Sequence, residues 1–187
     1  MKTKNVSAHL NNRGFSLIEL IVVIAIMAVL VVVAVASSSL MDSSYAKEVE
    51  RGIEDYIGMA KSKSMSVTAR EWYMELTMED DEYVAKLCKT EDVVTGEATE
   101  TRTVELDKES YNGRVEVIFG DGKTENKIDA DTALRIYFNS STGRVHKITV
   151  GGMDADISNG IGRISITSGS YNLTLKLFYN TGKCERE

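Results

Sequence analysis

The stretch RGFSLIELIVVIAIMAVLVVVAVA, residues 13–36, dominates this sequence. Between Leu20 and Ala36 it holds 17 residues without a charge or a side-chain hydrogen-bonding group. Extended back to Phe15 the run has 22 residues, and a helix of that length spans roughly 33 Å, close to the ~30 Å hydrocarbon core of a bilayer. Because the run is apolar on every side, we predict a membrane-spanning helix over residues 15–36.

The charges that flank this run predict its orientation. Lys2, Lys4 and Arg13 precede it without any acidic residue, whereas mixed charges follow it. Positive residues favour the cytoplasmic side, so we expect a single-pass protein in the cytoplasmic (inner) membrane with its N-terminus in the cytoplasm. The whole chain of 187 residues carries a net charge of −6, from 22 basic and 28 acidic residues. Loss of residues 1–14 removes three basic residues and leaves −9.

Two residues are unusual for an ordinary membrane anchor. Gly14 lies between the basic leader and the apolar run, whereas a secretory signal peptide is cut after its apolar region. Glu19 lies inside the run, where an ionised carboxylate costs about 2.5–3.5 kcal/mol at mid-bilayer. A charge kept at that depth indicates a functional residue that has a partner.

The run Arg13-Gly14-Phe15-Ser16-Leu17-Ile18-Glu19-Leu20, with the aliphatic stretch after it, resembles the N-terminal signature of type IV pilins and type II secretion pseudopilins. The resemblance implies that a prepilin peptidase cuts between Gly14 and Phe15 and then N-methylates Phe15. It also implies that Glu19 pairs with the new amino terminus of a neighbouring subunit, and a buried carboxylate is tolerable when it meets a cation. The implied partners are other pilin or pseudopilin subunits, the peptidase, the membrane and an assembly platform. The implied destination is a filament at the cell surface or outside the cell.

The absence of proline is a departure from many members of that family. They carry a proline that kinks the helix at the position matching Ala36. Without it we expect an unbroken helix, and we favour a minor pilin or a pseudopilin over a major pilin. The order of predicted elements and the tail at 179–183 are similar to the GspH/FimT-type minor pseudopilins.

Two simpler interpretations of the N-terminal region stay open. Ala34-Val35-Ala36 matches an A-x-A cleavage site before Ser37, and a plain signal anchor is the other alternative. Against a signal peptide, the apolar run exceeds the usual 7–15 residues and contains Glu19. Under either alternative the chain is a secreted or membrane-anchored binding module, or a surface enzyme whose site the sequence does not reveal.

Apolar residues return at helical spacing after Ser39. They form a stripe with charged residues on the other side, which predicts an amphipathic helix over residues 37–66. The stripe is made of Tyr45, Val49, Ile53, Ile57 and Ala60. It needs a surface to pack on, and a following β-sheet is the simplest one.

From Trp72 the apolar period changes from 3.6 to 2, which is typical of strands. Strand candidates follow at 72–78, 83–88, 103–106, 114–119, 133–138, 144–150, 161–167 and 171–179. Polar turns at 139–143 and 168–170 indicate hairpins. We therefore predict an α+β protein in which residues 67–187 form one antiparallel β-rich head of one sheet or two packed sheets.

Catalysis and cofactor binding find little support in the head. No nucleophile elbow, P-loop or metalloprotease motif is present. His146 is the sole histidine after the leader and falls in a strand candidate, where a solvent-facing role is the simpler reading. Acidic clusters at 79–82, 129–131 and 154–156 lack the spacing of a calcium loop, so we read them as solvated turns. We expect no enzyme activity, no cofactor and no metal.

The two cysteines and one basic cluster suggest further hypotheses. A disulfide between Cys88 and Cys184 is our preferred expectation on the exported side, with two unpaired, partly buried thiols as the alternative. Lys61, Lys63 and Arg70 lie near Trp72 and keep open a minor pilin that captures DNA. An acidic chain is nevertheless poorly suited to nucleic acid.

Overall fold

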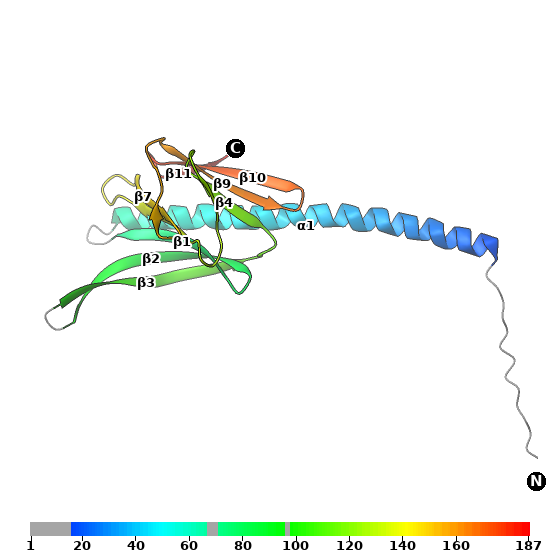
Figure 1. Ribbon diagram of the computed structural model, residues 1–187, viewed down its shortest axis with the longest axis horizontal. Coiled ribbons are helices and arrows are strands. Elements are labelled where there is room, and N and C mark those ends of the chain that lie inside the picture. The colour runs from blue at the N-terminus through cyan, green and yellow to red at the C-terminus, as the bar shows by residue number, and fades with distance from the viewer. Residues whose placement is uncertain (1–15, 67–70, 96–97) are drawn as a thin grey trace, which may run out of the picture. The chain divides into compact units, whose positions relative to one another are not determined.

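The computed structural model describes residues 16–66, 71–95 and 98–187, with side chains described except at 35–39 and 91–102. Figure 1 shows the helix and the strands that follow it in the chain. The chain divides into two compact units, of which one ends at Ser38 and the other, the head, runs from Ser39 to Glu187.

Helix α1 is a single element that spans Leu17–Ser66 and contains 50 residues. Its two parts have different surroundings because their sequences differ. The apolar side chains up to Ala34 are exposed, whereas Ala46, Val49 and Ile53 are 0 % exposed. The predicted amphipathic stripe and the helix through Ala36 are both confirmed, as the lack of proline allows.

The head contains two antiparallel sheets. The six-stranded sheet has the order β3-β2-β1-β6-β7-β8, and the five-stranded sheet has the order β11-β10-β9-β4-β5. The strands of the first are β1 Trp72–Glu79, β2 Glu82–Thr95, β3 Ala98–Tyr111, β6 Leu134–Phe138, β7 Val145–Val150 and β8 Met153–Asp154. Those of the second are β4 Glu116–Gly120, β5 Glu125–Lys127, β9 Ile161–Ser168, β10 Tyr171–Phe178 and β11 Lys183–Arg186. The α+β class is confirmed, and the strands form two sheets.

Strands β2 and β3 differ most from the sequence prediction. Each has 14 residues, although we predicted strands only at 83–88 and 103–106. Only Glu82–Lys89 of β2 pairs with β1, so the rest of β2 pairs with β3 alone. This two-stranded extension has a largely polar sequence. It therefore lacks the alternation of apolar and polar residues by which a strand is recognised. The short strands β5, β8 and β11 also escaped prediction, because two to four residues are too few to show a period.

Strands β1 and β2 are joined by a tight two-residue turn within the acidic cluster 79–82. Glu79 pairs with Glu82, so the turn has two central residues, Asp80 and Asp81, with φ of 49° and 64°. Positive φ at both positions is the geometry of a type I′ hairpin turn, which matches the twist of the flanking strands. Aspartate tolerates this left-handed region better than most residues do.

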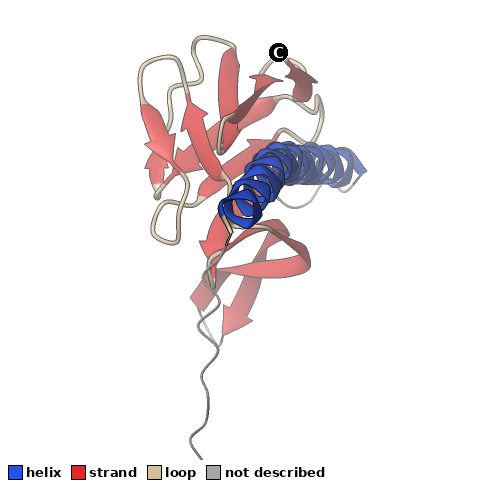
Figure 2. Ribbon diagram, turned by 90° about the vertical axis from the view of Figure 1, so that its right-hand side faces the viewer, coloured by secondary structure: helices blue, strands red, loops and turns tan. Residues whose placement is uncertain are grey.

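One hydrophobic core joins the head part of α1 to both sheets. Its members include Ile53 from α1, Met74 from β1, Phe119 from β4, Ile164 from β9 and Leu175 from β10. Figure 2 shows the helix with strands on more than one side of it. The helix thus fills the space between the inner faces of the sheets, which explains why its buried stripe is broad.

Candidate functional site

Helix α1 begins with a reciprocal pair of hydrogen bonds between Ser16 and Glu19. The backbone N–H of Glu19 donates to Ser16 Oγ at 3.2 Å, and the backbone N–H of Ser16 donates to Glu19 Oε2 at 3.3 Å. This is a capping box, which satisfies two backbone donors that a helix start leaves unpaired. The negative carboxylate also lies at the positive end of the helix dipole.

The sequence predicted a functional role for Glu19, and its hydrogen bonds with Ser16 were not predicted. The signal was present, because serine followed three residues later by glutamate, just before an apolar run, is the capping-box pattern. Gly14 and Phe15, the predicted cleavage and methylation residues, lie outside the described residues. Glu19 is exposed in the single chain, and its predicted pairing with another subunit stays a prediction.

The segment that follows the capping box has the length and composition of a membrane span. Leu17–Ala34 has a mean hydropathy of 3.2, and none of this window is buried within the chain. It contains one acidic residue, Glu19, and no basic residue. A run of exposed aliphatic side chains this long is unstable in water and therefore needs lipid or other apolar helices around it.

Comparison with known families gives one match. Residues 9–35 match the family model of the prokaryotic N-terminal methylation motif. This motif is the type IV pilin-like prepilin signal, and it supports processing of the chain as a pilin-like subunit. Comparison of the chain with curated proteins and with solved structures finds no match. The match includes Gly14, Phe15, Ser16 and Glu19, and it ends before the head begins.

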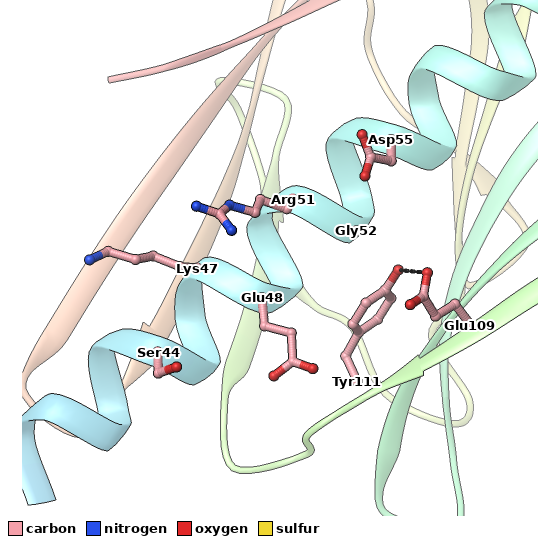
Figure 3. A pocket seen from close by; sticks show the side chains of 8 residues that line it. All are labelled: Ser44, Lys47, Glu48, Arg51, Gly52, Asp55, Glu109 and Tyr111. Carbon is pink, nitrogen blue, oxygen red and sulfur yellow. Dashed lines mark hydrogen bonds between the residues drawn. The ribbon is translucent and has the colours of Figure 1, made fainter.

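The head has a polar groove between α1 and the end of β3, shown in Figure 3. Its volume is about 490 Å³, and its lining residues are Ser44, Lys47, Glu48, Arg51, Gly52, Asp55, Glu109 and Tyr111. Tyr111 Oη donates a hydrogen bond to Glu109 Oε2 at 2.9 Å. Burial, followed by the bond to this carboxylate, raises the pKa of the Tyr111 hydroxyl well above its usual range. The hydroxyl of Tyr111 therefore stays neutral and serves to hold the end of β3 in place.

Gly52 makes the contact between α1 and Tyr111 possible. A Cβ atom at this position would overlap the ring and the hydroxyl of Tyr111. Figure 3 shows the ring beside the helix at Gly52, with Glu48 on the same side and Lys47 and Arg51 pointing away from it. The groove is therefore lined by side chains of both charges.

The predicted disulfide is absent, because Cys88 and Cys184 are both free and buried. Cys184 belongs to the hydrophobic core. Cys88 pairs in register with Tyr73, one residue along from the core-facing pair Met74 and Leu87, so it lies on the opposite, outer face of the six-stranded sheet. Burial raises the pKa of the Cys88 thiol to about 11 and that of Cys184 to about 12. Thiols that face different layers do not meet, and neither is a reactive thiolate at neutral pH.

The acidic clusters serve local structure in all three places. Glu79 forms an ion pair with Lys86 beside the turn at Asp80 and Asp81. Asp129 accepts hydrogen bonds from the backbone N–H groups of Asp131 and Thr132, and Asp156 forms an ion pair with Lys123. Within the described residues, no group of three or more histidine, cysteine, aspartate or glutamate side chains is placed to hold a metal ion. The expectation of no metal and no cofactor stays a prediction.

The structure also places the remaining sequence candidates. His146 Nε2 lies 2.9 Å from Glu71 Oε1 on the exposed face of the six-stranded sheet. Trp72 is 8 % exposed and belongs to the core, so it offers no stacking platform for nucleic acid. Lys61 donates a hydrogen bond to the carbonyl of Thr181 at 2.8 Å, and Arg70 lies outside the described residues.

Proposed function

We propose that this chain is a structural subunit of a type IV pilus or a secretion pseudopilus. In this role prepilin peptidase cuts between Gly14 and Phe15, methylates Phe15, and releases a subunit that joins a helical filament. Its partners are other pilin or pseudopilin subunits and an assembly platform of a pilus or type II secretion system. The role is structural, without enzymatic activity, and we favour a minor pilin or pseudopilin.

The observation that carries this proposal is the capping box at the N-terminus of an apolar helix whose side chains are exposed. Within Leu17–Ala34 every aliphatic side chain is available to lipid before assembly and to neighbouring helices after it. The one carboxylate of that window, Glu19, lies at its start. Cleavage after Gly14 would place a new amino terminus four residues before Glu19, so a copy shifted along the helix axis could offer this cation to the carboxylate.

We further propose that the chain is inserted with its N-terminus in the cytoplasm of the inner membrane and its head outside. The basic residues Lys2, Lys4 and Arg13 support this orientation. After assembly the N-terminal helices form the filament core, and the heads form its surface. The motif match at residues 9–35 supports processing, and it favours this function over a secreted binding module cut before Ser37.

Mass spectrometry of the mature N-terminus tests the processing step. We expect a chain that begins at N-methylated Phe15. A chain that begins at Ser37, or one intact at Met1, contradicts the proposal.

Substitutions at Glu19 and Ser16 test the role of the carboxylate, because they separate its charge from its capping function. Glu19→Gln keeps an oxygen acceptor for the capping box but loses the charge, so we expect membrane insertion to persist and filament incorporation to fail. Ser16→Ala is the matched control, since it weakens the cap by about 1 kcal/mol and leaves the charge. Normal incorporation of Glu19→Gln refutes the pairing role.

A minor pilin that captures DNA is a second candidate. The basic residues Lys61 and Lys63 at the end of α1 favour it. It is the weaker candidate because Trp72 is buried and cannot stack on a base. Binding of single-stranded DNA by the full-length chain, measured at low salt and lost in Lys61→Ala/Lys63→Ala, would favour it.

A further inference from the structure

Three hydrogen bonds make Ser16 the N-cap of α1. Its carbonyl accepts the first bond of the helix, from the backbone N–H of Leu20 at 3.2 Å. Its hydroxyl accepts from the N–H of Glu19 at 3.2 Å, and its own N–H donates to Glu19 Oε2 at 3.3 Å. Ser16 is itself non-helical, and Leu17 is the first helical residue. A side chain that caps the backbone in this way fixes the residue at which a helix begins.

Only one residue, Phe15, separates this cap from the predicted cleavage point between Gly14 and Phe15. A helix that loses its cap gains a backbone hydrogen bond for each residue by which it grows towards the N-terminus. Asn12 is the next residue upstream whose side chain suits an N-cap. A helix that began there would hold the Gly14–Phe15 peptide bond inside its first turn.

A peptide bond inside a helix is a poor substrate for a peptidase. In such a longer helix the carbonyl of Gly14, which the peptidase must attack, would accept a hydrogen bond from the N–H of Ile18. The backbone on both sides of the bond would also be closed to the enzyme, whereas an extended segment offers its N–H and C=O groups to a partner. The position at which α1 begins therefore decides whether this bond is accessible.

The residue on the other side of the scissile bond acts in the same direction. Glycine loses more backbone freedom in a helix than any other residue, so Gly14 opposes growth of the helix past Phe15. The sequence thus places a poor helix former just before the bond and a capping serine just after Phe15. Neither residue is required for the membrane span, which runs over Leu17–Ala34.

We propose that Ser16 is a positioning residue for processing. By starting α1 at Leu17, its cap keeps the Gly14–Phe15 bond ahead of the helix, where the peptidase binds it as an extended segment. This inference rests on the proposed function, because it concerns the cleavage that produces the subunit. Ser16 does not touch the reacting atoms in this role, and it acts through the start of the helix.

Cleavage of the full-length precursor in detergent by purified prepilin peptidase tests this role. Ser16→Thr keeps a capping hydroxyl, Ser16→Gly lacks a side chain but remains a good N-cap, and Ser16→Ala is a poor N-cap. We expect kcat/KM of the threonine and glycine variants to stay within about twofold of the unaltered chain. We expect that of Ser16→Ala to fall about two- to fivefold. Glu19→Gln, which keeps an acceptor for the N–H of Ser16, is the control and should be cut at the normal rate.

The kinetic constants distinguish this role from others. A longer helix lowers the fraction of precursor that is competent to bind, so KM should rise in Ser16→Ala while kcat stays unchanged. A lower kcat at constant KM overturns the proposal. Equal losses in Ser16→Gly and Ser16→Ala also overturn it, because they assign the hydroxyl to direct contact with the peptidase. Slowing of the expected size still allows cleavage to go to completion, so Ser16→Ala remains a valid control for filament incorporation.

Nuclear magnetic resonance of the precursor in detergent micelles measures the helix start directly. Gly14-Phe15 is the only Gly-Phe pair in the chain, so ¹³C-carbonyl glycine combined with ¹⁵N phenylalanine gives a single signal from the scissile peptide. We expect the Gly14 carbonyl shift to move towards its helical value in Ser16→Ala and to stay in place in Ser16→Gly. An unchanged shift in Ser16→Ala overturns the proposal.

These outcomes separate two kinds of failure. If the proposed function fails, the unaltered chain is not cut between Gly14 and Phe15, as mass spectrometry of the product shows. If only the positioning role of Ser16 fails, the unaltered chain is cut there and the threonine, glycine and alanine variants are cut equally fast.

Discussion

Between Leu17 and Ala34, α1 exposes its apolar side chains, whereas between Ala46 and Ala60 the same helix buries an apolar stripe in the head. Both parts form regular helix, so backbone propensity does not distinguish them. The difference lies in how the apolar residues are distributed around the axis. The first part is apolar on every side, and the second has one apolar and one charged face.

This difference separates two sources of stability. The second part gains its stability from packing inside the head, so it belongs to the folding unit that begins at Ser39. The first part gains nothing from the rest of the described chain and depends on lipid or on other subunits. Substitutions in the two parts should therefore affect different measurements, and the following predictions use that contrast.

The largest expected effect comes from the same substitution in both parts. Ile53 is 0 % exposed and Ile24 is 60 % exposed. Ile53→Ala should lower the free energy of unfolding of the head by about 2–5 kcal/mol, because it leaves a cavity in the core. Ile24→Ala should leave that free energy unchanged. Urea unfolding of the full chain in detergent, followed by fluorescence of the single tryptophan, Trp72, measures both. Equal losses would contradict the contrast.

A smaller effect is expected at two glycines of α1. A methyl group at Gly52 would overlap Tyr111, whereas a Cβ at Gly58 has no neighbouring atom within 4 Å. Gly52→Ala should lower the free energy of unfolding by about 1–3 kcal/mol through displacement of the ring. Gly58→Ala should raise it by about 0.5–1 kcal/mol, because alanine favours helix. Thermal unfolding of the two variants tests this, and a stabilised Gly52→Ala would show that Tyr111 moves freely.

A further effect concerns acid and the head alone. Asp121 is buried and accepts hydrogen bonds from the backbone N–H groups of Thr124, Lys123 and Asp156, which lower the pKa of its carboxyl to about 2. The unfolded pKa is about 3.9, so the folded state binds the proton more weakly. The stabilisation is therefore complete above about pH 4 and disappears as the pH falls towards 2.

We expect this acid loss to amount to about 1–2 kcal/mol and to shrink in Asp121→Asn. Unfolding free energies at pH 5, 4 and 3 provide the measurement. Asp131→Asn is the control, because the Asp131 side chain is exposed and makes no hydrogen bond within the described residues. The same pH dependence in Asp121→Asn and the unaltered chain would exclude this carboxyl as the source.

Local patterns predicted the helix and most strands. Trp72, Met74 and Leu76 belong to the core as their alternation predicted. Tyr73, on the other face of β1, is buried as well, which the alternation did not predict. The long β2–β3 ribbon escaped prediction because its polar residues need no buried face. The disulfide expectation was wrong for a related reason, since cysteine spacing does not reveal which face of which sheet each thiol occupies. At the candidate site, the sequence located Glu19, while the structure added its hydrogen bonds to Ser16.

By itself the sequence determined the apolar run, the position of Glu19 within it and the period of the helix and the main strands, because each depends on residues close together along the chain. Only the tertiary structure decided the order of strands in two sheets and the placement of Cys88 and Cys184 on different faces. Tertiary structure also joins residues such as Glu48 and Asp81, or Lys61 and Gly143, which are distant in sequence and become neighbours only when α1 packs against the sheets.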